Sequence, residues 1–313
     1  VIAYAQVGHD PATERQRIRA APRFDDFLKE YWTRWSPQWK ASTLETHDGY
    51  RRQYLDKAFQ RLFIDELNEE HLTKWFAELN NRTSPGAANR TLEILKHMFN
   101  KAETWGYRLE NTNPCRAVRA NRRKHCERFL TKEELASLGD VLDAMRTGPD
   151  SARRDAAAVI SLLLLTGCRY REIMDLQWPD VKGNRLKLRD SKTGPRTVWL
   201  GKPARAIIDD LPRRPNNPWL FWNERTRQRL KDISHIWIKV RQEAGLGKLR
   251  IHDLRHTFAS HAAMNKETLP MIGRLLGHAN HQSTARYAHL DDEHLLDAAQ
   301  QIGDAVEKLM AVA

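Results

Sequence analysis

An arginine at the end of an apolar segment is the first residue in this sequence whose position suggests chemistry. Arg169 follows the apolar run 156–165 and a Thr-Gly-Cys sequence, so its guanidinium is expected to emerge where a buried helix stops at Gly167. Glu172 stands three residues later, close enough on a following helical turn to orient Arg169. An ordinary ion pair at a helix end has the same pattern, so these residues alone leave the function open.

A second group of chemically versatile residues is His252-Asp253-Leu254-Arg255-His256. On a helix, His252 and Arg255 share one face. His252 and His256 also have the i, i+4 spacing of a zinc pair, which leaves a metallohydrolase as an alternative. The metal interpretation is weak, because Asp253 stands where such a motif has glutamate and Arg255 would place a permanent positive charge beside the cation.

A third group ends in a tyrosine. Gly277 is expected to end a helix and to present His278 just beyond it. Ser283 is predicted to cap a short helix that carries Tyr287. Taken alone, a tyrosine near a chain end is usually half-buried packing whose hydroxyl touches water.

The elements that must position these residues begin with a helical region between residues 24 and 106. Helices are predicted from Phe24, over 42–59, over 69–79, and from a Ser84 cap to a stop at Gly106, which together make a small bundle. The apolar face of the first helix consists of Phe24, Phe27, Leu28, Tyr31 and Trp32.

A basic segment follows this bundle. Residues 116–132 carry seven basic side chains and one acid, Glu127. The segment is either a solvated tether or a strap that lies on phosphates, and the sequence favours neither. The candidate DNA-binding residues within it are Arg116, Arg119, Arg122, Arg123 and Lys124.

The second half of the chain is predicted to be mainly helical with one β-hairpin. Thr131 and Glu134 form a capping box at the start of a new helix. Alternating patterns over 185–189 and 196–200 predict two strands, joined by a turn that places Lys192 near its tip. The expected fold class is therefore mainly α with a small β-sheet or hairpin.

Composition narrows the class of protein. The 313 residues favour two domains, and 52 basic against 40 acidic residues give a net charge of +12, which favours a polyanionic partner. No apolar run approaches the roughly 20 residues of a membrane span, and 41% hydrophobic residues with ten Trp exclude a disordered chain. Three scattered cysteines suggest neither disulfides nor a zinc knuckle, so we expect a reducing cytoplasm.

Taken together and in order, these segments resemble the tyrosine recombinase (phage integrase) family. The match consists of an arginine motif, a lysine on a hairpin, a His-x-x-Arg box and a C-terminal Leu-Gly-His box with a tyrosine nine residues after its histidine. It covers the chain from about Phe24 to the end. The residues that carry it are Arg169 with Glu172, Lys192, His252 with Arg255, His278, and Tyr287.

The resemblance implies a role for each of these residues in phosphodiester exchange. Tyr287 would attack the phosphorus and leave a 3′-phosphotyrosyl enzyme, while Arg169, Arg255 and His278 would bind the non-bridging oxygens. His252 would accept the tyrosine proton and Lys192 would protonate the leaving 5′-oxygen. Glu172 would orient Arg169, and neither a metal ion nor another cofactor is expected.

The resemblance also implies a domain organisation. Residues 1–21 would be a linker or the remnant of an upstream arm-binding domain, and 22–115 a helical core-binding (SAM-like) domain. A basic linker over 116–130 would join it to a mixed α/β catalytic domain over 131–290, followed by a C-terminal helix over 291–313.

The expected partners are double-stranded DNA attachment sites and further copies of the chain. The family pattern implies integration or excision of a mobile element by a tetramer on DNA that is a monomer when free. DNA-bending or directionality proteins would assist, and no membrane would be involved. Two alternatives remain open, a type IB topoisomerase-like enzyme and a sequence-specific DNA-binding protein that has lost catalysis.

Overall fold

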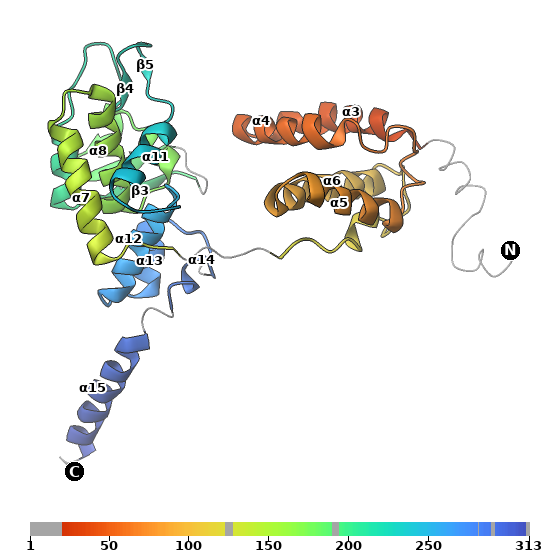
Figure 1. Cartoon of the computed structure of the whole chain (residues 1–313). Coiled ribbons are helices and arrows are strands. Elements are labelled where there is room, and N and C mark those ends of the chain that lie inside the picture. The colour runs from red at the N-terminus through yellow and green to blue at the C-terminus, as the bar shows by residue number, and fades with distance from the viewer. Residues whose placement is uncertain (1–20, 123–127, 190–193, 281, 289–291, 311–313) are drawn as a thin grey trace. The chain divides into compact units, whose positions relative to one another are not determined.

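The chain folds into two compact units, residues 1–125 and residues 126–313, and each is described by itself. The computed structural model describes residues 21–122, 128–189, 194–280, 282–288 and 292–310 (Figure 1). The boundary between the units falls inside the segment 116–130.

Unit 1 is a helical bundle. It consists of α3 (Phe24–Trp35), α4 (Ala41–Tyr50), α5 (Glu69–Arg82) and α6 (Pro85–Thr104). Ser84 caps α6 by accepting a hydrogen bond from the N–H of Ala87, as predicted. The prediction of a helix over 42–59 is too long. The α-helix ends at Tyr50, continues as one π-helical turn, η2 (Arg51–Leu55), and then gives way to turns.

The core of unit 1 is rich in aromatic residues. The predicted face of α3 is buried as a whole. Tyr31 in that face is 1% exposed, and its hydroxyl is 2.7 Å from Nδ1 of His97 on α6. Residues just beyond the bundle also pack on it, since Cys115 in η3 (Pro114–Arg116) and Val118 are buried in the same core.

Unit 2 is built around a buried helix, α8 (Ser151–Thr166), which contains the apolar run predicted to form a core helix. The capping box of Thr131 and Glu134 starts α7 (Lys132–Thr147), and both α7 and α10 (Lys202–Asp209) pack against α8. The remaining helices are α9 (Tyr170–Met174), α11 (Ser234–Glu243), α12 (Asp253–Met264), α13 (Leu269–Leu276), α14 (Gln282–Ala285) and α15 (Asp292–Met310).

The predicted hairpin is present in unit 2 as β2 (Arg185–Leu188) paired antiparallel with β3 (Arg196–Trp199). Leu186, Leu188 and Val198 point into the core, as the alternating pattern indicates. A third strand, β1 (Val181–Lys182), extends this sheet, and β4 (Trp222–Asn223) pairs with β5 (Gln228–Arg229) in a second sheet. The sequence pattern did not predict these two-residue strands.

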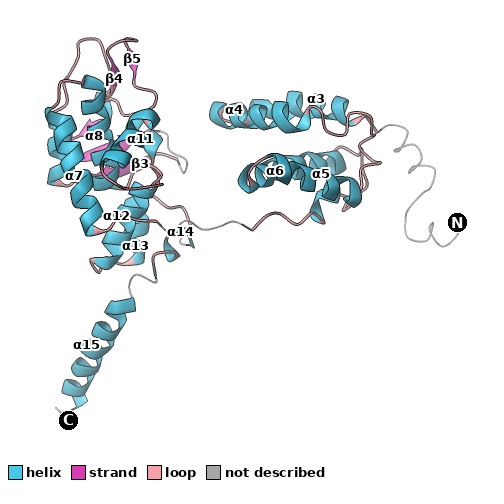
Figure 2. Cartoon of the chain, viewed as in Figure 1, coloured by secondary structure: helices cyan, strands magenta, loops and turns pink. Residues whose placement is uncertain are grey.

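The prediction of a mainly helical fold with a small β-sheet is confirmed (Figure 2). Among the described residues, no helix is both long and apolar enough to cross a membrane.

Candidate active site

The apolar helix α8 delivers the first arginine motif. Gly167 ends α8 with φ of +61°, a conformation that favours glycine, and a Cβ there would lie 2.5 Å from the ring of Phe258. Arg169 follows as the residue before α9. Its Nη1 donates to Oε1 of Glu172 at 2.8 Å, and its backbone N–H donates to Oε2 at 2.8 Å. The predicted contact between these two residues is therefore present.

A second arginine shares that carboxylate. Arg196, the first residue of β3, donates from Nη2 to Oε2 of Glu172 at 2.7 Å and from Nη1 to the carbonyl of Leu275 at 3.1 Å. Burial alone would raise the pKa of Glu172, but hydrogen bonds from Arg196 and Arg169 lower it below its usual value. One ionised carboxylate thus pairs with two guanidinium groups, and the three side chains together keep one net positive charge.

Arg255 occupies the centre of unit 2. It is 4% exposed and donates to the carbonyl oxygens of Gly167 at 2.6 Å and Leu276 at 2.8 Å. These bonds join the end of α8 to the end of α13 through α12. Burial, together with the neighbouring charges of Arg169 and Arg196, lowers the pKa of Arg255 to about 10.

His278 lies just beyond α13, where the sequence pattern predicts it. Gly277 ends the helix with φ of +67°, and a Cβ there would lie 2.6 Å from Cδ of Arg196. Nδ1 of His278 is 2.7 Å from Oγ1 of Thr284 on α14. Burial and the charges of Arg255 and Arg169 lower the pKa of His278 to about 4, so the imidazole is neutral at pH 7.

His252 precedes α12 as its N-cap residue, and its side chain is exposed. Its ring lies 5.1 Å from the ring of His256, edge to face. Partial desolvation and the charge of Arg255 lower the pKa of His252, which keeps the imidazole neutral.

Tyr287 is 4% exposed, and its hydroxyl is 2.7 Å from Nδ1 of His256. Among the described residues, the Tyr287 hydroxyl is therefore hydrogen-bonded to His256 rather than to His252. Burial raises the pKa of Tyr287, against the opposing charges of Arg286 and Arg255. The predicted local helix is corrected in two ways, because Ser283 lies inside α14 and Tyr287 lies in the turn that follows it.

The remaining predicted residues divide into three groups. Arg119 and Arg122 are exposed on unit 1. Arg116 is also exposed, but its Nη2 lies 2.9 Å from Oε2 of Glu103, so an acid already balances its charge. Three further candidates lie outside the described residues: Lys192, Arg123 and Lys124.

Two residues of the site were missed from the sequence, Arg196 and His256 as the partner of Tyr287. A signal for Arg196 exists in the alternating strand pattern. It shares a strand face with Val198, which points into the core, so an arginine there requires a buried acid. The sequence indicates His256 as one half of a zinc pair and as the residue after Arg255 in the His-x-x-Arg box, and neither pattern connects it with Tyr287.

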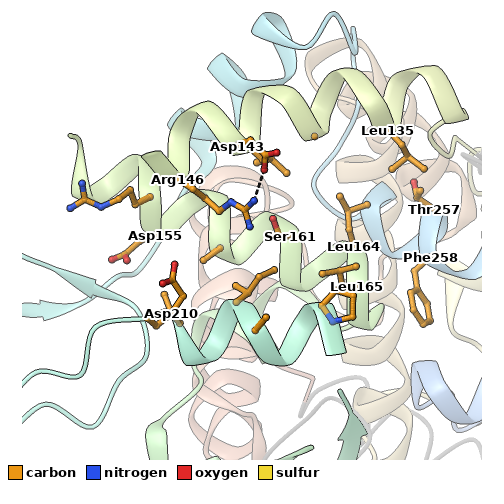
Figure 3. Close-up of a pocket in the computed structure, with 18 of the residues that line it drawn as sticks. Leu135, Asp143, Arg146, Asp155, Ser161, Leu164, Leu165, Asp210, Thr257 and Phe258 are labelled. Atoms are coloured by element: carbon orange, nitrogen blue, oxygen red, sulfur yellow. Dashed lines mark hydrogen bonds and ion pairs between the residues drawn. The ribbon is translucent and has the colours of Figure 1, made fainter. Parts of the chain in front are cut away.

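A separate cavity of about 1160 Å³ lies in unit 2 between α7, α8, α10 and α12. Leu135, Leu164, Leu165 and Phe258 line it together with further apolar side chains (Figure 3). None of the predicted catalytic residues within the described part of the chain lines this cavity, so it is distinct from the arginine cluster.

The chain belongs to the phage integrase family, whose sequence profile matches residues 128–294. The predicted family is thereby confirmed. Tyrosine recombinase XerC of Chromohalobacter salexigens is 32% identical over 186 residues, which cover 57% of this chain and 61% of that protein. The integrase of Escherichia phage 186 is 25% identical over 293 residues, covering 87% of this chain and 80% of the relative.

Solved structures show the same fold. A lambda integrase dimer bound to a COC′ core site matches with a TM-score of 0.71 at 18% identity, covering 89% of this chain and 81% of that one. The Tn1549 transposon integrase in complex with circular intermediate DNA matches with a TM-score of 0.67 at 16% identity, covering 83% and 93%. The chain spans 61% of the XerC relative above and half of the XerC of Pseudomonas aeruginosa.

Proposed function

We propose that this protein is a site-specific DNA recombinase that cuts and rejoins duplex DNA through a 3′-phosphotyrosyl intermediate. The observation that carries the proposal is the convergence of Arg169, Arg255 and His278 in unit 2, where both arginines donate to backbone carbonyls at the end of α13, just before His278. Like charges held close together in a protein interior are stabilised by an anion. A DNA phosphate is the anion that the family relationship suggests.

In this proposal the two arginines bind the non-bridging oxygens of the scissile phosphate. Planar guanidinium groups form two parallel hydrogen bonds to such oxygens and neutralise the charge that builds up on the pentavalent phosphorus. Neutral His278 donates a further hydrogen bond. Glu172 and Arg196 fix Arg169, so little reorganisation is needed when the phosphate enters.

Tyr287 is the proposed nucleophile. Its oxygen forms a bond to phosphorus, the bond to the 5′-oxygen breaks, and attack by a 5′-hydroxyl of a partner strand reverses the step without ATP. His252 is the proposed acceptor of the phenol proton, because it is neutral and exposed beside the arginines. Lys192 is proposed to protonate the leaving 5′-oxygen.

The proposed partners are DNA attachment sites of a mobile element and three further copies of the chain. The solved structures with the same fold include a lambda integrase tetramer bound to a Holliday junction. Arg119 and Arg122 are exposed for phosphate contacts. We further propose that the free protein is a cytoplasmic monomer and that DNA-bending or directionality proteins assist it.

The C-terminal helix α15 is proposed to join neighbouring copies. Its residues Ile302, Val306, Leu309 and Met310 are 49–76% exposed and recur at helical spacing. The apolar cavity of Figure 3 offers a surface of matching chemistry on another copy. Leu309→Asp should therefore reduce tetramer assembly on DNA, measured by light scattering, while cleavage of a single site persists.

The experiment that tests the proposed activity is covalent trapping. Wild-type protein is incubated with a library of nicked candidate attachment sites, and covalent adducts are separated on denaturing gels and sequenced. Tyr287→Phe should bind the recovered site equally well but form no adduct. An adduct that persists in this variant would assign the nucleophile to another residue, and failure of the wild type on every site would refute the activity.

Two further assays on the wild-type protein distinguish a recombinase from the two alternatives. A type IB topoisomerase-like enzyme would relax supercoiled plasmid without a defined site and as a monomer. A silent DNA-binding protein would shift a candidate attachment site on native gels but form no adduct with any site of the library.

A further inference from the structure

The nucleophile proposed above is buried in the free chain. Tyr287 packs against Ile272 and Leu276 of α13 and against small residues of α12, and only 4% of its surface is exposed. Its hydroxyl contacts Nδ1 of His256, which is itself 8% exposed. A phenol in this position cannot reach the phosphorus of a DNA backbone, which approaches from solvent.

The partner of the phenol is a neutral imidazole. Burial, together with the charges of nearby His252 and Arg286, lowers the pKa of His256 to about 4. The pKa of Tyr287 is raised by burial, so both groups are uncharged at pH 7. A neutral hydrogen bond of this kind contributes only about 1 kcal/mol, which DNA binding can readily exceed.

In the segment around Tyr287, one side chain is held firmly by its neighbours and another is held by a single hydrogen bond. Thr284 of α14 is anchored to Nδ1 of His278 at 2.7 Å and lies against Gly273, where an added Cβ would approach its Oγ1 to 3.0 Å. Tyr287 lies in the turn three residues later, and its side chain is hydrogen-bonded to His256. The backbone N–H of Tyr287 also donates to the carbonyl of Thr284 at 3.0 Å, so release of the phenol requires its side chain to rotate away from His256 while α14 stays in place.

We infer that His256 is a positioning residue that holds Tyr287 in a buried, unreactive place, and that cleavage requires this hydrogen bond to break. The inference rests on the proposed function of Tyr287 as nucleophile. It assigns to His256 a role separate from that of His252, since His256 restrains the phenol before the reaction and His252 accepts its proton during it.

The test measures how accessible the Tyr287 hydroxyl is in the full-length protein without DNA. N-acetylimidazole acetylates exposed tyrosine hydroxyls, and peptide mass spectrometry gives the rate for each tyrosine. His256→Leu removes the partner and leaves the buried hydroxyl unsatisfied, which favours the exposed state. Acetylation of Tyr287 should therefore rise about fivefold or more. His256→Asn keeps a polar atom near the position of Nδ1 and should restore protection.

Unit 1 supplies a matched control. Tyr31 and His97 have the same geometry, with hydroxyl and Nδ1 2.7 Å apart. His97→Leu should leave acetylation of Tyr287 unchanged. Tyr170 of unit 2, whose hydroxyl donates to Asp232 at 2.9 Å, reports on folding of the His256 variants, because its acetylation should stay at the wild-type rate in each of them. If His256→Leu also raises acetylation of Tyr170, unit 2 has unfolded, and His256→Gln, whose longer side chain displaces the polar atoms from the Nδ1 position, decides instead.

A cleavage assay on the site recovered by covalent trapping completes the test. The first-turnover rate of His256→Leu should equal or exceed that of the wild type. A tenfold loss would make His256 part of the chemistry and overturn the inference, as would unchanged acetylation of Tyr287. If the wild type forms no adduct at all, the proposed function fails, whereas the acetylation result still decides whether His256 restrains Tyr287.

Discussion

The two units each contain a buried tyrosine bonded to a histidine, and the two pairs differ in what surrounds them. Tyr31 lies in the middle of α3, a helix of 12 residues, with Phe27, Trp39 and Trp105 in ring contact. Tyr287 lies in a turn after the four-residue helix α14. The same 2.7 Å contact is thus part of a rigid core in unit 1 and a single restraint in unit 2.

The arginines of the two units show the same contrast. In unit 1, Arg108 donates to the carbonyls of Ile64, Leu67 and Thr112, and the charges of Asp65 and Glu103 partly offset the lowering of its pKa by burial. In unit 2, Arg255 donates to two carbonyls, and the charges of Arg169 and Arg196 lower its pKa further, against a smaller opposing effect of Glu172.

The difference teaches how to separate structural from functional polar groups. Both arginines donate hydrogen bonds to backbone carbonyls, although Arg108 is half-buried and Arg255 is 4% exposed, so hydrogen bonding does not identify the site. The sign of the neighbouring charge does, because repulsion between Arg255 and Arg169 opposes folding and is relieved only by an anion.

The largest expected effect comes from replacing these arginines by lysine, which keeps the positive charge but removes the planar guanidinium group. Arg255→Lys should lower the rate of covalent cleavage by about 100-fold or more, because an ammonium group cannot make paired bonds to two phosphate oxygens. Arg108→Lys should leave cleavage within about threefold and lower the free energy of unfolding by about 1–3 kcal/mol. Adduct formation and urea unfolding measure the two effects. Equal losses of cleavage in both variants would remove the distinction between the units.

The next effect concerns the acids that balance the arginines. Glu172→Gln leaves two half-buried guanidinium groups without their shared counter-charge, and should lower the free energy of unfolding by about 3 kcal/mol. Glu103→Gln in unit 1 keeps an amide oxygen that can accept from the N–H of Asn113 and weakens only the ion pair with Arg116, which is 43% exposed, so it should cost about 1 kcal/mol or less. Added sulfate should recover part of the loss only in the Glu172 variant, measured by urea unfolding.

A smaller effect follows from the histidines of unit 2. His256 and His278 have folded pKa values of about 4, below the usual 6.5, so the unfolded chain binds protons first as the pH falls. The contribution of these two neutral histidines to the free energy of unfolding is fully present above pH 6.5 and is lost as the pH falls from about 6.5 to 4. At pH 5 each histidine should cost about 1–2 kcal/mol. Urea unfolding of His256→Leu should show a shallower decline over this range, and an unchanged slope would contradict the assignment.

Local chemistry made much of this structure predictable. Ser84, Thr131 and Gly277 act within one helical turn, so the ends of three helices could be read from neighbouring residues. Contacts between residues far apart in the sequence could not be predicted in this way. The bond between Arg196 and Glu172 and the bond between Tyr287 and His256 depend on how distant elements pack, which no spacing in the sequence encodes.

The short elements were also beyond prediction. The strands β1 and β4 have two residues each, too few for an alternating pattern to be recognised. Ser283 has the right chemistry for a cap, yet α14 begins one residue earlier. In such short segments tertiary contacts, rather than local preference, fix where an element starts.

The smallest expected effect separates the two tyrosines by stability alone. Tyr31→Phe leaves Nδ1 of His97 without its partner inside a rigid aromatic core, and should lower the free energy of unfolding by about 1 kcal/mol. Tyr287→Phe should cost less, because Tyr287 lies in a turn, which can adjust more readily than a helix core when the hydroxyl is lost. Urea unfolding at pH 7.5 measures both. A cost of 3 kcal/mol or more at Tyr287 would mean that its side chain is part of the core of unit 2. DNA binding could then not release Tyr287 simply by breaking its hydrogen bond to His256, which would contradict the proposed role of His256.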